Sequence, residues 1–160
     1  MRPHYRMKGA WVLMLALSLC TSVAAQTQQE HVHGHAHAVM PFDVAKTVHV
    51  FTMTESGGIE RVIVKDERDR GEVPLIRQHL RKESMRFREG NYSDPATLHG
   101  AGMPGLRELQ AGVKHVAVSY ADVPDGGEIT FTTKDLRLLT AIHRWFGAQL
   151  SEHGADARAG

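Results

Sequence analysis

The sequence is poor in the groups that build disulfide-bonded, thiol-dependent or membrane-spanning proteins. It has a single cysteine among 160 residues, Cys20, which lies in an N-terminal segment that we expect to be removed. The mature chain would then contain no disulfide bond and no thiol nucleophile. The apolar run of that segment, Ala10–Leu19, is too short to span a bilayer.

The sequence also has no large excess of positive or negative charge. Lysine and arginine total 19 and aspartate and glutamate 18, which gives a formal net charge of +1. Loss of residues 1–25 removes Arg2, Arg6 and Lys8 and no acidic residue, so the mature chain would carry a formal charge of −2. Without a basic excess, the composition gives no support for nucleic acid as a partner.

The sequence lacks the HExxH, GxSxG, P-loop and CxxCH motifs. Gly100-x-Gly102-x-x-Gly105 matches the letters of a dinucleotide-binding fingerprint, but no strand of a βαβ unit precedes it and Pro104 lies inside it. An enzyme is therefore the least favoured class. It would need a pocket that joins His99 and His143 to a carboxylate.

The N-terminus has the three parts of a secretory signal peptide. Basic residues precede the apolar run, and the small residues Val23-Ala24-Ala25 follow it. Residues 1–25 are therefore predicted to be a signal peptide. This predicts a periplasmic or secreted protein that meets a membrane only during export. Ten of the eleven histidines lie after the expected cleavage site.

Residues 26–43 are predicted to be a His-rich, flexible or strand-like arm. Imidazoles recur at every second position and a thioether follows closely; these residues are His31, His33, His35, His37 and Met40. Neutral imidazole suits copper, zinc and nickel, and methionine favours reduced copper. An extended backbone would line the four rings along one side. The alternative is a solvated tail without a specific role.

The rest of the chain contains two similar successions of two strands, a Gly-Gly turn and a long helix. The predicted strands are 46–53, 59–65, 113–120 and 128–133, and the predicted long helices are 75–89 and 136–152. The predicted fold class is α+β, with two ββα units forming a four-stranded antiparallel sheet and two long helices on one face. It would occupy residues 44–154 as one domain, with 155–160 a disordered tail.

Strand alternation separates Val48 and Val50 from His49 and Met53. If the valines face the helices, then His49, Met53 and, in the second unit, His115 lie on the open face of the sheet. That face could hold a metal ion or a partner. The alternative is that these are ordinary surface residues.

His99 and Met103 form a second compact group in a glycine-rich loop. They can converge on one ion if the loop turns, and glycine permits such a turn. The alternative is a loop whose methionine fills the core. Sequence leaves the roles of three further histidines open: His79 and His143 lie beside apolar stripes, as core histidines do, and His153 lies near a helix C-terminus.

Four segments together resemble a known family of small exported bacterial proteins of unknown function, some of which carry the label aspartate carbamoyltransferase. The segments are Met40-Pro-Phe-Asp, Thr47-Val-His-Val-Phe51, His99-Gly-x-x-Met-Pro-Gly-Leu106 and the stretch from Ala141 to Gly154. The resemblance covers about residues 40–156. Carbamoyltransferases bind carbamoyl phosphate through a Ser-Thr-Arg-Thr loop and a His-Pro-x-Gln segment. Neither occurs in this sequence, so the resemblance does not imply that activity.

The sequence as a whole favours a metal-handling protein outside the cytoplasm. Copper is the first candidate ion, with zinc or nickel as alternatives. The arm would capture the ion, and some of His49, Met53, His99, Met103 and His115 would hold it. A second hypothesis is a non-catalytic interaction module that pairs with a partner, or forms a homodimer, through the open sheet face.

Overall fold

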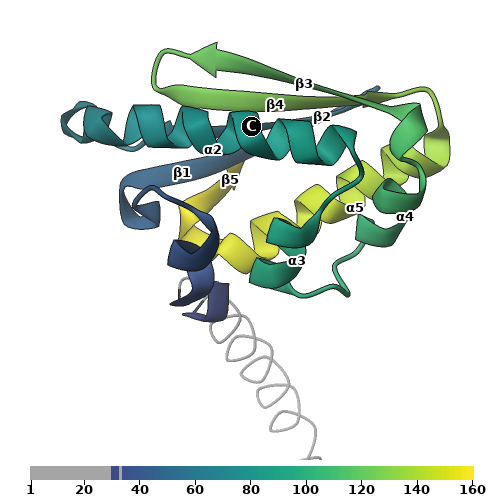
Figure 1. Ribbon diagram of the computed structural model, residues 1–160, viewed down its shortest axis with the longest axis horizontal. Coiled ribbons are helices and arrows are strands. Elements are labelled where there is room, and N and C mark those ends of the chain that lie inside the picture. Colours follow the sequence, from purple (N-terminus) through teal and green to yellow (C-terminus); the bar gives the residue numbers. More distant parts are fainter. Residues whose placement is uncertain (1–29, 33) are drawn as a thin grey trace, which may run out of the picture.

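The computed structural model describes residues 30–32 and 34–160; the predicted signal peptide and His33 lie outside the described residues. The fold is α+β, with a five-stranded mixed sheet and helices packed against it (Figure 1). The strand order is β3-β4-β2-β1-β5.

The sheet has one strand more than predicted. Strands β1 (Thr47–Thr54), β2 (Gly57–Val64), β3 (Val116–Val123) and β4 (Gly126–Thr133) pair antiparallel, as expected. The fifth strand, β5 (Ala157–Ala159), pairs parallel with β1 at the edge. The tail that we predicted to be disordered therefore belongs to the sheet. The prediction was wrong because the tail has no apolar alternation, and its order comes from backbone pairing with β1.

The helices begin and end at the expected signals. Pro74 lies in the first turn of α2 (Val73–Arg88), and the side chain of Asp135 accepts the Arg137 N–H at the start of α5 (Leu136–His153). Two short helices follow α2, namely α3 (Ser93–His99) and α4 (Leu106–Ala111). Within the described part of the chain, no helix has the length and apolar character needed to cross a membrane.

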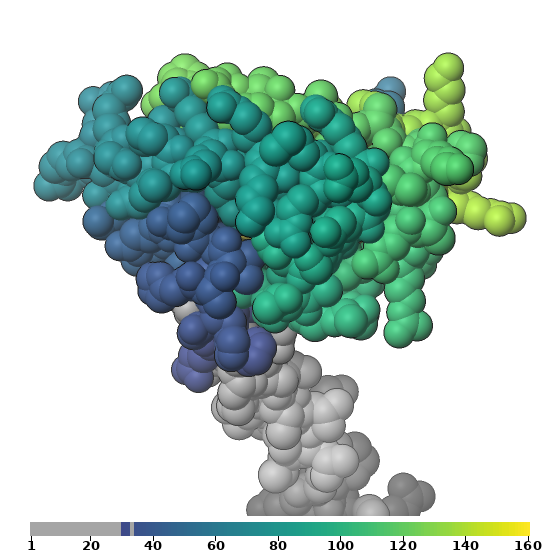
Figure 2. Space-filling model, viewed as in Figure 1, coloured from purple at the N-terminus to yellow at the C-terminus, as the bar shows by residue number. Residues whose placement is uncertain are grey.

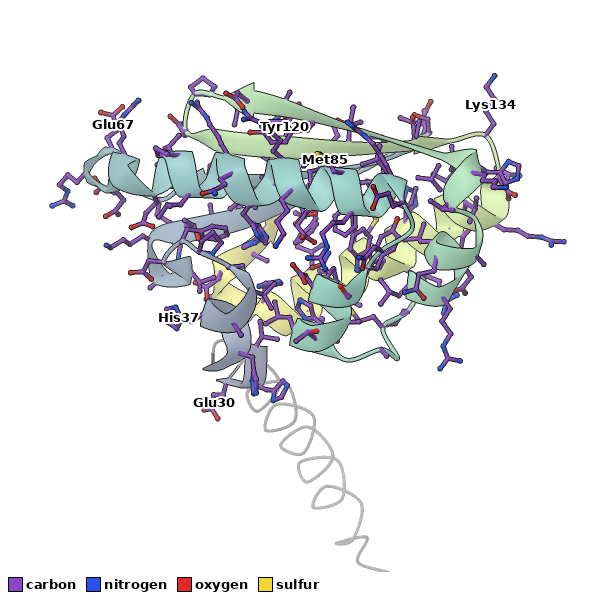
Figure 3. The ribbon with its side chains drawn as sticks, viewed as in Figure 1. Glu30, His37, Glu67, Met85, Tyr120 and Lys134 are labelled. Carbon is purple, nitrogen blue, oxygen red and sulfur yellow. The ribbon has the colours of Figure 1, made fainter. Side chains whose placement is uncertain are left out.

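The described part of the arm is helical instead of extended. Residues 30–32 and 34–39 are helical, and Val32, Ala36 and Met40 are buried in the main hydrophobic cluster. These three residues recur every four positions, the spacing that places side chains on one face of a helix. The alternating histidines concealed this stripe. Figure 2 shows the start of the described chain packed against the body, and Figure 3 shows His37 pointing away from it.

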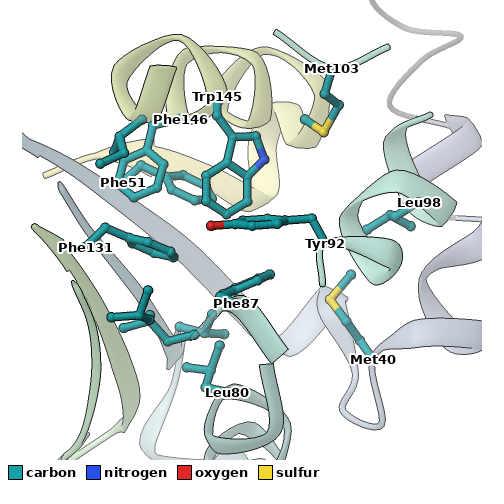
Figure 4. Packing of buried hydrophobic residues seen from close by; sticks show 14 of the residues in the cluster. Met40, Phe51, Leu80, Phe87, Tyr92, Leu98, Met103, Phe131, Trp145 and Phe146 are labelled. Carbon is teal, nitrogen blue, oxygen red and sulfur yellow. The ribbon is translucent and has the colours of Figure 1, made fainter. Parts of the chain in front are cut away.

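The core lies between one face of the sheet and both long helices. Phe131 of β4 contacts Phe87 of α2, with 5.6 Å between ring centroids, and Trp145 and Phe146 of α5 at 5.4 and 5.9 Å (Figure 4). Edge-to-face and tilted contacts of this kind are favourable aromatic arrangements. The two long helices therefore cover the same face.

The face assignment of β1 was wrong. His49 pairs with Val62, and Phe51 with Glu60, so His49 and Phe51 share the helix-covered face. Val48 and Val50 lie on the other face. Both sides of this alternating pattern are apolar, and the larger Phe51 takes the core position. His115 is also not in a strand, because it ends a short 3-10 turn (Val113–His115) and is exposed.

Candidate functional site

A small cavity lies where the arm, α2, α3 and the C-terminal half of α5 meet the sheet. Its volume is about 40 Å³, which is enough to hold a water molecule or a small ion. It is lined by residues of the arm (Val39, Met40), β1 (His49), β2 (Glu60), α2 (His79, Leu80, Glu83, Phe87), α3 (Asp94, Pro95, Leu98, His99) and α5 (Trp145, Gln149, His153).

Four buried polar atoms on the walls of this cavity have no hydrogen-bond partner within the described part of the chain. They are His49 Nδ1, Glu83 Oε2, His99 Nε2 and Trp145 Nε1. Buried polar groups in native proteins are almost always paired, so each exception needs an occupant or a function. Four exceptions around one cavity indicate a site for a small polar ligand or an ion.

His99 is held by a carboxylate. It is the last residue of α3, and its Nδ1 lies 2.8 Å from Glu152 Oε2 near the end of α5. An ionised carboxylate only accepts hydrogen bonds, so Nδ1 carries the hydrogen and Nε2 keeps its lone pair. Burial lowers the pKa of His99 despite the opposing effect of Glu152. The free Nε2 is therefore a buried Lewis base in the cavity wall.

The rings of three histidines stand in a row along one side of the cavity. His49 stacks on His153 at 4.7 Å between centroids, and His153 meets His99 at 4.9 Å in an edge-on contact. Burial lowers the pKa of His49 to about 3. His79 also lines the cavity, edge-on to Phe42, and burial lowers its pKa to about 4. His49 and His79 therefore stay neutral at neutral pH, which is the form that can bind a metal ion.

Two carboxyl groups of the cavity lining, Glu60 and Glu83, have raised pKa values. Burial raises the pKa of Glu60 to about 7. Burial and the neighbouring Asp94 raise the pKa of Glu83 to about 8. Arg86 Nη1 lies 3.2 Å from Glu83 Oε1 and also pairs with Asp94. One guanidinium group cannot neutralise both carboxylates, so the more buried Glu83 keeps its proton and can donate it in a hydrogen bond.

The structure brings only part of the predicted ligand set together. Met40, His49 and His99 line the cavity. Met53 is 45% exposed near the end of β1, and Met103 is buried in the core (Figure 4). Predicted ligands on the surface, away from the cavity lining, are His31, His35, His37 and His115. Across residues 30–32 and 34–160, no three His, Cys, Asp or Glu side chains are already gathered in a metal-binding group.

Several cavity residues were not predicted as site residues: Glu60, His79, Glu83, Asp94, Trp145, Gln149 and His153. Two of them carry a signal in the sequence. Glu60 alternates in phase with the buried Val62 and Val64, and Glu83 falls in the helical stripe of Ile76, Leu80 and Phe87. A carboxylate at a core position is rare unless it is paired or functional.

His143 has a structural role outside the cavity. Its Nε2 lies 3.0 Å from Thr54 O and 2.9 Å from Gly57 O, at the turn between β1 and β2. We expect His143→Leu to lower the free energy of unfolding by about 1–2 kcal/mol, because two carbonyl oxygens lose their donor. Urea unfolding measures this, with the exposed His115→Leu as the control. Equal effects of the two substitutions would contradict this role.

Comparison with known proteins found no matching family model, curated protein or solved structure.

Proposed function

We propose that the protein binds one soft or borderline transition-metal ion in the cavity, with Cu(I) as the first candidate and Zn(II) or Ni(II) as alternatives. The observation that carries the proposal is the pair formed by His99 and Glu152. A histidine that donates one ring N–H to a carboxylate, and presents the other nitrogen unpartnered, is typical of metal ligands.

The proposed ligands are His99 Nε2, His49 Nδ1 and the thioether sulfur of Met40. Both nitrogen atoms are buried and unpartnered among the described residues, and Met40 lines the same cavity. A thioether with neutral imidazoles favours Cu(I) over harder ions. The N–H of Trp145 and the protonated Glu83 can donate to a water or an anion that accompanies the ion.

General-base catalysis is the second use of a histidine oriented by a carboxylate. It would need a nucleophile or a bound water next to His99. The described cavity lining includes no serine, threonine, cysteine or lysine. We favour metal binding because it also gives a role to His49 and Met40, two further potential ligands in the cavity lining.

The proposed setting is outside the cytoplasm, periplasmic or secreted. The signal-peptide pattern of residues 1–25 supports it. Copper would then be bound outside the cytoplasm. The mature chain would have no thiol, so its copper ligands would be imidazoles and thioethers.

Competition titration of the full chain with Cu(I), Cu(II) and Zn(II) tests the proposal. We expect His99→Gln, His49→Gln and Met40→Leu each to weaken Cu(I) binding at least about tenfold, because each removes a direct ligand. The matched controls are His115→Gln, an exposed imidazole, and Met103→Leu, a buried thioether outside the cavity lining. Binding by His99→Gln at the parent's affinity, or equal losses in the controls, would refute the inner site.

A further inference from the structure

The described helical residues 30–32 and 34–39 carry a pair of histidines on their outer side. Val32 and Ala36 face the body and are almost completely buried, whereas His31 and His35 are exposed. Residues four apart are neighbours on a helix surface. The two imidazole rings accordingly lie 4.2 Å apart between centroids, tilted by 36°. Because Val32 and Ala36 hold the opposite face of the helix against the body, the two histidines point toward solvent.

A backbone hydrogen bond selects the tautomer of His35. Its Nδ1 lies 2.9 Å from the carbonyl oxygen of His31. A carbonyl oxygen only accepts, so Nδ1 carries the hydrogen and Nε2 keeps its lone pair. Metal-binding histidines are commonly fixed in this way, with one ring N–H given to a backbone carbonyl. The pair therefore already has the spacing of a chelate, and His35 has the tautomer of a metal ligand.

We propose that His31 and His35 form a second, outer metal site, a two-imidazole chelate that takes a borderline divalent ion such as Zn(II), Ni(II) or Cu(II), with water completing the coordination. This site goes beyond the inner cavity and does not depend on it. Its ligands are two imidazoles without a thioether, so it differs from the inner site in the ions it prefers.

The outer pair lies near the inner cavity. Charge on His31 contributes to lowering the pKa of His99, which places the two side chains within electrostatic range. Met40 continues the buried stripe of the same helix and lines the cavity. An ion held by His31 and His35 would cross-link one turn of the helix next to the cavity wall, and so stabilise residues 30–39 in their docked position.

The test compares two double variants of the full chain with identical changes in composition. His31→Gln with His35→Gln removes the proposed chelate. His33→Gln with His37→Gln removes two histidines at the same spacing; His37 is exposed and His33 lies outside the described residues. Zn(II) affinity is measured by titration, and amide hydrogen exchange over residues 30–39 reports on the helix.

We expect the first double variant to lose at least about tenfold in Zn(II) affinity and to lose the Zn(II)-induced slowing of exchange. The second is expected to keep both. Equal losses in both variants would overturn the proposal, because Zn(II) would then bind to any histidines of the tract and not to the pair His31 and His35. No loss in either would also overturn it. His99→Gln and Met40→Leu must leave this Zn(II) response intact, so failure of the inner site is distinguishable from failure of the outer one.

Discussion

The metal-free protein is expected to lose stability as the pH rises from about 6.5 to about 8, by on the order of 2 kcal/mol, and the double variant Glu60→Gln, Glu83→Gln is expected to lose much less. The cause is the pair of protonated carboxyl groups in the cavity wall. Their pKa values are raised from 4.5 to about 7 for Glu60 and about 8 for Glu83.

The sign follows from which state holds the protons. In the unfolded chain both carboxyl groups ionise near pH 4.5. The folded protein keeps their protons to higher pH, so their contribution to stability is complete below pH 4.5 and is lost as the pH rises through 7 and 8. Charged groups facing Glu83 are Asp94 and Glu60, which raise its pKa further, and Arg86, which opposes the shift. A glutamine side chain stays neutral and has no such dependence.

Two histidines act in the opposite direction at lower pH. The pKa values of His49 and His79 are lowered from 6.5, so their contribution is lost as the pH falls below 6.5. The parent and the variant are therefore compared from pH 6.5 upward, where these histidines contribute little to the change in stability. Urea unfolding with a chelator present measures the difference between parent and variant. The control is Glu55→Gln with Glu89→Gln, which removes two exposed carboxylates. A flat parent profile, or a control that removes the slope, would contradict the assignment.

Much of the fold was predictable because local signals agree with tertiary structure. Pro74 and Asp135 mark the starts of α2 and α5, and each Gly-Gly pair begins a strand directly after a turn, at Gly57 for β2 and Gly126 for β4. Edge strand β5 was not predictable, since three residues held by backbone pairing leave no pattern in the sequence. The faces of β1 were ambiguous because both are apolar. The conformation of the arm was predicted wrongly because two patterns overlap in it. The histidines recur every two residues, as in a strand, whereas Val32, Ala36 and Met40 recur every four, as in a helix.

The candidate site was harder to predict than the fold. Residues from the arm, two strands and three helices meet at one cavity. Their positions along the chain do not indicate that they lie close together in space. His99, Met40 and His49 were predicted as ligands from their residue type and local spacing, but the sequence did not indicate that they line one cavity. Their orienting and proton-holding neighbours, Glu152 and Glu83, became visible only with the three-dimensional arrangement.

Glu152→Ala is expected to weaken metal binding at the inner site by about ten- to a hundredfold, although Glu152 is not itself a proposed ligand. It is a positioning residue. Its Oε2 accepts the Nδ1–H of His99 at 2.8 Å, which orients the ring and leaves Nε2 free for the ion. Without the carboxylate, the ring can turn and adopt the other tautomer, and its ligating nitrogen is less basic.

The matched control is Glu108→Ala, which also removes a carboxylate from an ion pair, here with Arg144 at 3.0 Å on the exposed surface. We expect this control to bind Cu(I) as the parent does. Glu152→Gln should restore part of the affinity, because its amide oxygen can still accept the Nδ1–H. Thermal unfolding of each variant separates loss of binding from loss of fold. If a folded Glu152→Ala variant binds Cu(I) with the parent's affinity, His99 does not act as a carboxylate-oriented ligand, because a ligand held in this way must respond to loss of the group that holds it.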